Sequence, residues 1–171
     1  MAHYQMALLI NPNEVEARIS LGNALFQKGL VDEAIVQFQK ALETDPNSAG
    51  GHYNLGVALS QKGQVDEAIE QYQKAVEINP NDVKVRNSLG IALFQKGRVD
   101  EAVTQFKKAV AITPTYSEAH NSLGIALFRR GHLDEAIAQF EEALRIDPAN
   151  TDVQNNLARA QAMTRPGAAQ K

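Results

Sequence analysis

A stretch of eight residues occurs twice in the chain, and this repetition constrains the fold more than any other feature. Residues 87–94 read Asn-Ser-Leu-Gly-Ile-Ala-Leu-Phe, and residues 121–128 are identical. The offset is 34 residues. Near copies precede them at residues 20–26 and 54–60, and a fainter copy follows at residues 156–160. Self-similarity at a fixed period of this length indicates stacked repeats rather than one ordinary domain.

Several residue types return at the same place in every repeat. A leucine recurs at Leu21, Leu55, Leu89, Leu123 and Leu157. A glycine follows it at Gly22, Gly56, Gly90 and Gly124, with Ala158 in the fifth place. A second glycine recurs at Gly29, Gly63, Gly97 and Gly131. A proline ends each unit at Pro12, Pro46, Pro80, Pro114 and Pro148.

Each unit reads as two helices. In the third, residues 83–96 contain no proline and carry apolar residues at helical spacing, and Gly97 then favours a stop. A second helix is predicted from about Asp100, whose carboxylate suits the positive end of a helix dipole. It should end at Thr113, because Pro114 disfavours the helical conformation of the residue before it.

The small residues predict that the two helices of a unit lie close together. A glycine inside a helix costs roughly 1 kcal/mol relative to alanine, so its recurrence at Gly90 indicates that packing requires the missing side chain. Gly90 and Ala102 are compatible with close backbone approach. Phe106 is long enough to fill the space beyond them.

This pattern resembles the tetratricopeptide repeat. The resemblance implies an all-α fold, a right-handed solenoid of antiparallel helix pairs. It covers four full repeats, at residues 15–48, 49–82, 83–116 and 117–150. Residues 1–14 match the second half of a truncated repeat, with Tyr4 and Ala7 in register with Phe38 and Ala41. The chain is therefore expected to be part of a longer protein.

The C-terminal end is expected to close the array. Residues 151–163 match a first helix only and are predicted to cap the solenoid, with Leu157, Ala158 and Ala160 facing inward. Residues 164–171, which lack periodicity, are predicted to be a disordered tail.

Two positions depart from the family pattern. The aromatic residue three positions before the Leu-Gly pair is replaced by basic side chains, which are expected to lie along the surface with packed stems. These are Arg18, His52, Arg86 and His120. The tyrosine three positions after the glycine is replaced by leucines that preserve apolar volume. These are Leu25, Leu59, Leu93 and Leu127.

Composition and motifs argue against several classes of function. The formal net charge of −3 offers no electrostatic signature for nucleic acid or an anionic membrane, and cysteine is absent. No apolar run approaches the length of a membrane span, and a cytoplasmic location is favoured. The histidines do not cluster, and no phosphate loop, zinc-binding pair or serine elbow occurs, so no catalytic residue, metal or cofactor is expected. Acidic pairs such as Asp100-Glu101 recur at helix starts, where dipole and capping roles are expected.

The predicted function is therefore non-catalytic protein–protein interaction. In arrays of this kind first helices line a concave groove, which implies a binding surface for an extended peptide or partner segment. The residues that this register places in the groove are Tyr53, Val57, Asn87, Ile91, Phe94, Asn121, Ile125, Phe128, Arg129 and Asn155. Asn23 also belongs to it, and Arg159 follows on the last helix. The alternative for the apolar members is simple packing against neighbouring helices.

Within the groove, Asn87, Asn121 and Asn155 share one column and could form a ladder that bonds a peptide backbone. The competing interpretation is that these amides bond one another or water.

One subclass of the family grips a terminal carboxylate through a lysine-and-asparagine clamp. Asn23, Asn54 and Lys84 coincide with three of its five positions. Ile19 and Ser88 replace its remaining two cations, so the anion would lose its main charge partners and this function is disfavoured.

Two other functions are alternatives. Self-association through exposed repeat ends would make the chain a structural scaffold. RNA binding, known for related 35-residue helical repeats, is disfavoured by the period and by the acidic charge balance.

Overall fold

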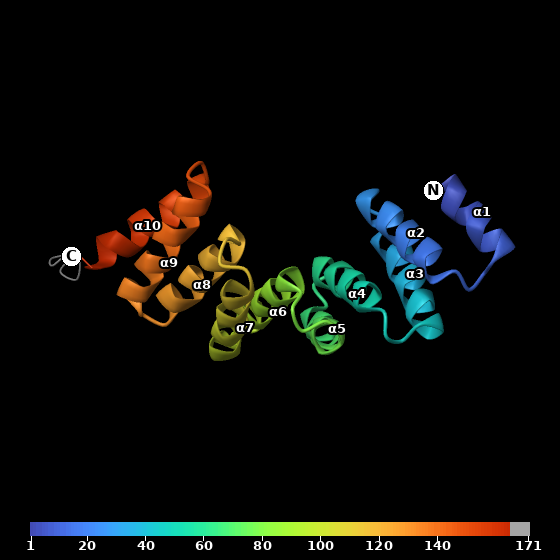
Figure 1. The fold of residues 1–171 in the computed structure, drawn as a ribbon, viewed down its shortest axis with the longest axis horizontal. Coiled ribbons are helices and arrows are strands. Elements are labelled where there is room, and N and C mark those ends of the chain that lie inside the picture. The colour runs from blue at the N-terminus through green and yellow to red at the C-terminus, as the bar shows by residue number, and fades with distance from the viewer. Residues whose placement is uncertain (165–171) are drawn as a thin grey trace. The chain divides into compact units, whose positions relative to one another are not determined.

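The computed structural model describes residues 1–164, which form helices and no strand (Figure 1). The described chain separates into two units, the first ending at Val85 and the second starting at Arg86. The helices of the first unit are α1 (Ala2–Ile10), α2 (Val15–Gln27), α3 (Val31–Thr44), α4 (Ala49–Gln61) and α5 (Val65–Ile78). Those of the second are α6 (Val83–Gln95, which begins in the first unit), α7 (Val99–Ile112), α8 (Ser117–Arg129), α9 (Leu133–Ile146) and α10 (Thr151–Thr164).

Within each unit, consecutive helices pack as pairs. Such pairs include α2 with α3, α4 with α5, and α8 with α9. The recurring leucines supply much of the apolar contact, because Leu55, Leu89 and Leu123 are buried together with the alanines of the second helices. The all-α repeat fold predicted from the 34-residue period is confirmed.

The second glycine of each repeat ends the first helix, as predicted. Gly97 has a φ of 76°, a left-handed conformation that other residues rarely adopt. Its N–H donates to the carbonyl of Phe94 at 2.9 Å, and the N–H of Arg98 donates to the carbonyl of Leu93 at 2.9 Å. This pair of bonds satisfies carbonyls that the end of α6 would otherwise leave open and turns the chain into α7.

The first glycine of each repeat lets an aromatic ring reach the helix backbone. A Cβ atom at Gly90 would lie 2.4 Å from Cε1 of Phe106, and one at Gly124 would lie 2.5 Å from Cε1 of Phe140. Both rings are almost fully buried. The prediction that this glycine makes room for the second helix is confirmed.

The two ends differ from the expected packing. Tyr4 is exposed on α1, which has no buried residue. On α10, Val153 and Ala160 are fully buried, whereas Ala158 is exposed, so the prediction that Ala158 faces inward is wrong. The physical reason is that this column normally faces the second helix of its own repeat, and no such helix follows α10 in the described residues.

The predicted tail also needs one correction. Thr164 is the last residue of α10 rather than the first residue of a tail. The rest of the predicted tail, residues 165–171, lies outside the described residues. Over residues 1–164 no helix combines the length and the apolar character needed to cross a membrane.

Candidate functional site

An open apolar cavity lies on the first helices of the second unit. Its volume is about 350 Å³. Ile91, Phe94 and Gln95 come from α6, Phe106 forms part of it from α7, and Asn121, Ser122 and Ile125 come from α8. The side chain of Ile91 remains 41% exposed although it is large and apolar. The lining thus combines exposed apolar surface with amide and hydroxyl groups.

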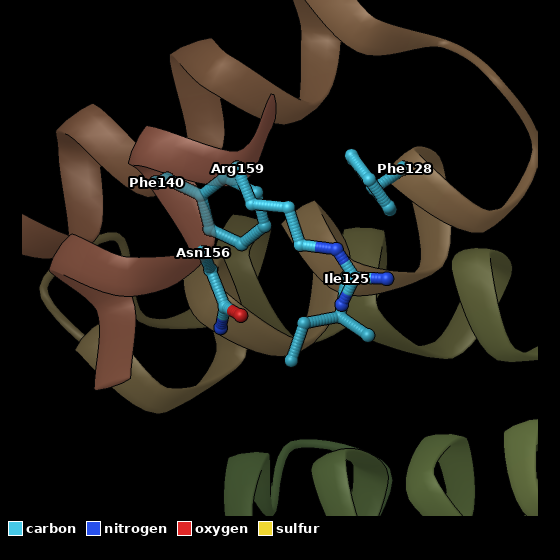
Figure 2. A pocket seen from close by; sticks show the side chains of 5 residues that line it. All are labelled: Ile125, Phe128, Phe140, Asn156 and Arg159. Atoms are coloured by element: carbon cyan, nitrogen blue, oxygen red, sulfur yellow. The ribbon is translucent and has the colours of Figure 1, made fainter. Parts of the chain in front are cut away.

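The equivalent place one repeat further along is nearly filled. This second cavity has a volume of about 60 Å³ and is lined by Ile125, Phe128, Phe140, Asn156 and Arg159 (Figure 2). Arg159 extends from α10, and its guanidinium carbon lies 5.3 Å from the centroid of the Phe128 ring. That geometry is a cation–π contact.

Side-chain length explains why one cavity is open and the other is closed. In the repeat register, Arg159 stands where Ile125 stands in the open cavity, and Asn156 stands where Ser122 stands. Both replacements are longer. Asn156 also crosses to the neighbouring helix, where its Nδ2 donates to Oδ1 of Asn121 at 3.1 Å.

The two cavities lie on one surface, which we call the first-helix face of the second unit. It includes the lining residues from the first helices and the residues in the same repeat register. Its members are Ile91, Phe94, Gln95, Asn121, Ser122, Ile125, Phe128, Arg129, Asn155, Asn156 and Arg159. Of the groove residues predicted for this unit, the structure gathers Ile91, Phe94, Asn121, Ile125 and Phe128 around the two cavities.

The asparagines of the predicted column differ in solvent exposure. Asn155 is exposed and Asn121 is half-buried, but Asn87 is only 6% exposed. Oδ1 of Asn87 is buried and has no hydrogen-bond partner among the described residues. The expectation that Asn87 presents its amide in an open groove therefore needs correcting, because neighbouring atoms cover that amide. Asn121 bonds to Asn156, one residue beyond the column, rather than to Asn155.

The predicted contact residues of the first unit lie on three helices. On α2, Asn23 is exposed, and Lys84 is exposed at the start of α6. On α4, Tyr53, Asn54 and Val57 are half-buried. No hydrogen bond or ion pair joins Asn23, Asn54 and Lys84 to one another among the described residues.

The ring of Tyr53 lies 6.0 Å from that of Tyr72, centroid to centroid. Burial raises the pKa of the Tyr72 hydroxyl well above its ordinary value, with a smaller contribution from Tyr53. Tyr72 therefore stays neutral in the packed core.

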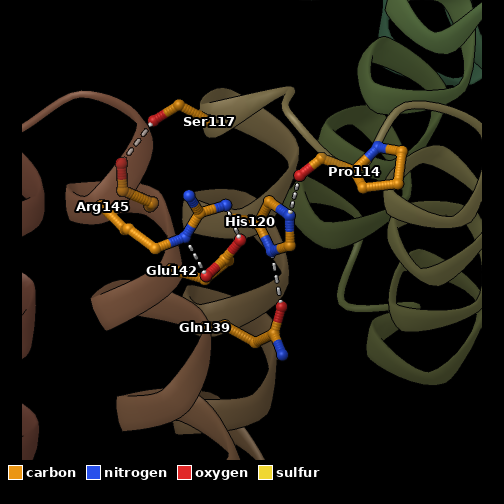
Figure 3. A network of polar contacts seen from close by, with 7 residues as sticks. Pro114, Ser117, His120, Gln139, Glu142 and Arg145 are labelled. Carbon is orange, nitrogen blue, oxygen red and sulfur yellow. Dashed lines mark hydrogen bonds and ion pairs between the residues drawn. The ribbon is translucent and has the colours of Figure 1, made fainter.

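A buried polar network replaces the surface position expected for the basic column. His52 and His120 are buried, so the expectation that they lie along the surface is wrong. Nε2 of His120 lies 3.0 Å from the carbonyl oxygen of Pro114, and Nδ1 lies 2.8 Å from Oε1 of Gln139 (Figure 3). His52 repeats this geometry with Pro46 and Gln71.

The rest of that column makes contacts of the same two kinds. Arg18 donates to the carbonyl of Pro12, Arg86 donates to Oε1 of Gln105, and Gln154 donates to the carbonyl of Pro148. These bonds go to carbonyls of the proline turns or to glutamines on the second helices, which gives the column a structural role. The sequence held a signal for these contacts. Each residue of the column carries an N–H donor, and a glutamine lies 19 positions after each of the first four.

Exposed ion pairs lie on the second helices. In Figure 3, Arg145 donates to Glu142 at 2.6 Å, and this hydrogen bond lowers the pKa of the Glu142 carboxyl. Between neighbouring repeats, Arg130 lies 3.1 Å from Asp100. At the starts of α7 and α9 the N-cap residues Arg98 and His132 make no side-chain cap, and the acidic residues lie in the first turn, where the helix dipole favours negative charge. Within residues 1–164, no three histidine, aspartate or glutamate side chains are placed to share a metal ion.

The helix pairs, the positive-φ glycine between them and the ring against the first glycine define an all-α repeat solenoid. The family model described as "TPR repeat" matches residues 22–63 and 58–97, and the one described as "Tetratricopeptide repeat" matches residues 89–151 and 121–165. The chain belongs to the tetratricopeptide repeat family. Its fold is that of a protein-interaction module, a class that is generally non-catalytic.

Solved structures agree with this assignment. The chain is similar to MamA, with 30% identity over 87% of each chain and a TM-score of 0.79. It is also similar to YrrB, described as a TPR protein with an unusual peptide-binding site, with 26% identity over 94% of this chain and 82% of that one, and a TM-score of 0.81. PilF of Pseudomonas aeruginosa shares 28% identity over 87% of this chain and 68% of that one, with a TM-score of 0.80. No curated protein sequence matches the chain.

Proposed function

We propose that the chain binds an extended segment of a partner protein on the first-helix face of its second unit. The observation that carries this proposal is the open apolar cavity between α6 and α8, which Ile91, Phe94 and Ile125 line. At about 350 Å³, the cavity has room for one large side chain together with its backbone. Burying such a side chain is worth about 1.5–3 kcal/mol.

Asn121 supplies a polar contact beside the cavity. Its Oδ1 already accepts from Asn156, so its amide N–H groups are the ones that would meet a peptide carbonyl. The similarity to YrrB supports a peptide ligand, since that protein has a peptide-binding site by its own description. In the first unit, the predicted partner contacts stay predictions; they are Asn23, Tyr53, Asn54, Val57 and Lys84.

A selection experiment tests this function. Peptides selected from a random library on the parent chain should bind the Ile91→Ser variant about ten-fold more weakly, because the cavity loses apolar surface. The matched control is Ile112→Ser, since Ile112 on α7 is 37% exposed and Ile91 is 41% exposed. Binding constants from fluorescence anisotropy would decide the question. Equal binding to the parent and to both variants would show that the cavity is not the site.

A second candidate function is self-association through α1. Leu9 and Ile10 are 77% and 81% exposed, and Tyr4 and Met6 on the same helix are also exposed. Apolar surface gathered in this way is typical of association sites.

Sedimentation equilibrium over a range of concentrations tests the second candidate. The parent chain should show a mass that rises with concentration, and the Leu9→Ser, Ile10→Ser double variant should stay closer to a monomer. Ile112→Ser again serves as the control. A parent chain that remains monomeric at every concentration would contradict self-association.

A further inference from the structure

Two arginines on the first-helix face of the second unit have no polar partner among the described residues. They are Arg129, the last residue of α8, and Arg159 on α10. The other arginines of residues 1–164 each donate to a carboxylate, an amide or a carbonyl. These are Arg18, Arg86, Arg98, Arg130 and Arg145. Arg159 lies over the Phe128 ring, and Arg129 and Arg159 are both exposed residues.

Among the residues that define the first-helix face, the charged side chains are Arg129 and Arg159, whereas the column of Lys84 continues outside this face as Glu118 and Asp152. The whole chain carries a formal net charge of −3, yet no aspartate or glutamate is a member of the first-helix face as defined above. In the repeat register, Arg129 on α8 corresponds to Gln95 on α6, which lines the open cavity. One end of this face is therefore apolar and open, and the other end is cationic and unpaired.

We propose that the segment bound on this face carries an apolar side chain and a carboxylate about three residues apart. This proposal rests on the proposed function and specifies its ligand. The apolar side chain enters the cavity beside Ile91, and the carboxylate pairs with Arg159 and Arg129. Equivalent points on neighbouring repeats lie about 10 Å apart, a distance that about three residues of extended chain span.

The contact with Phe128 prepares Arg159 for this role. A guanidinium that lies over an aromatic ring keeps the N–H groups on its edge free, and that fork matches the two oxygens of a carboxylate. The cavity beneath Arg159, about 60 Å³, is too small for a second large side chain. The face thus accepts one apolar side chain and one anion rather than two apolar side chains.

Capped synthetic peptides test the proposal directly. The probe Gly-Ser-Leu-Ser-Ser-Glu-Ser-Gly has leucine and glutamate three positions apart, and a second probe has them in the reverse order to cover both chain directions. Control peptides replace glutamate by glutamine or leucine by serine. One more peptide lacks glutamate and ends in a free carboxylate at the same spacing. This last peptide distinguishes a terminal carboxylate from an acidic side chain.

Titrations followed by NMR should show a clear order. The glutamate peptide should bind roughly two- to five-fold more tightly than the glutamine peptide, a ratio that an exposed ion pair supports. Rising salt should reduce this ratio. Arg159→Gln should remove most of the preference for the glutamate peptide. Lys108→Gln makes the same change of charge at an exposed position of α7 and should leave that preference unchanged.

The outcomes separate this proposal from the one it rests on. Equal binding of the glutamate and glutamine peptides, while leucine-to-serine replacement still weakens binding, would overturn the carboxylate and leave the apolar site standing. An effect of Lys108→Gln as large as that of Arg159→Gln would also overturn it, since the preference would then follow net charge alone. Failure of every leucine peptide to shift signals near Ile91 would count against the proposed function itself.

Discussion

Replacing Leu123 with alanine should lower the free energy of unfolding by about 2–5 kcal/mol, as deletion of a buried leucine side chain does. Leu123 is 3% exposed, and a closely packed interior relaxes only partly around the cavity that such a deletion leaves. The loss should spread to neighbouring repeats, because each repeat of a solenoid is stabilised by its interfaces with the next. Urea titrations followed by circular dichroism would measure the change.

The control for this experiment is Ile112→Ala. It removes apolar atoms from a side chain that is 37% exposed on α7, so the expected loss is below about 1 kcal/mol. If Leu123→Ala changed the urea midpoint no more than the control did, burial of the recurring leucines would not be what stabilises the core.

Replacing Gly124 with alanine should destabilise the chain by about 1–3 kcal/mol, although alanine is the better helix former. The new Cβ would lie 2.5 Å from Cε1 and 2.7 Å from Cδ1 of Phe140. Because Phe140 is 1% exposed, its ring cannot swing into solvent. The overlap should therefore outweigh the gain in helix propensity of roughly 1 kcal/mol.

Gly50→Ala provides a control of the opposite sign. Gly50 lies in the first turn of α4, and a Cβ atom there would meet nothing within 4 Å. This variant should be as stable as the parent or up to about 1 kcal/mol more stable. Adding Phe140→Leu to Gly124→Ala should recover part of the loss, since the two sites are in contact. A Gly124→Ala variant at least as stable as the parent would refute the packing argument.

The features that could be predicted from the sequence are those that depend on local residues. The stop of α6 at Gly97 could be predicted because a residue with positive φ is a local requirement that glycine meets at the lowest cost. The contact between Gly90 and Phe106 could be predicted because recurrence of an unfavourable helix residue indicates a packing need. Both features depend on a few neighbouring residues.

The candidate site shows where such reasoning stops. The sequence places Ile125 and Arg159 in the same column, but it does not show that one leaves a cavity open while the other closes it. That difference depends on the length of a side chain relative to a ring on another helix. The burial of Asn87 likewise depends on how helices converge, and the register alone predicted a displayed amide.

The basic column illustrates the same limit for polar residues. Arg18, His52, Arg86 and His120 were expected at the surface because charge and exposure usually go together. His52 and His120 are instead buried, since carbonyl oxygens at the proline turns and glutamines on the second helices offer them partners. Only the packed helices bring those partners within hydrogen-bond distance.

The sequence by itself determined the period, the helix pairs, the glycine stops and the membership of a repeat family, because each of these is specified by spacing along the chain. The tertiary structure decided which residues of each column are exposed or buried, and which cavities between them are open or filled. It showed one open cavity beside Ile91, its closed counterpart beneath Arg159, and an exposed Ala158. The physical reason is that exposure is a property of the atoms packed around a side chain, and those atoms come from other helices.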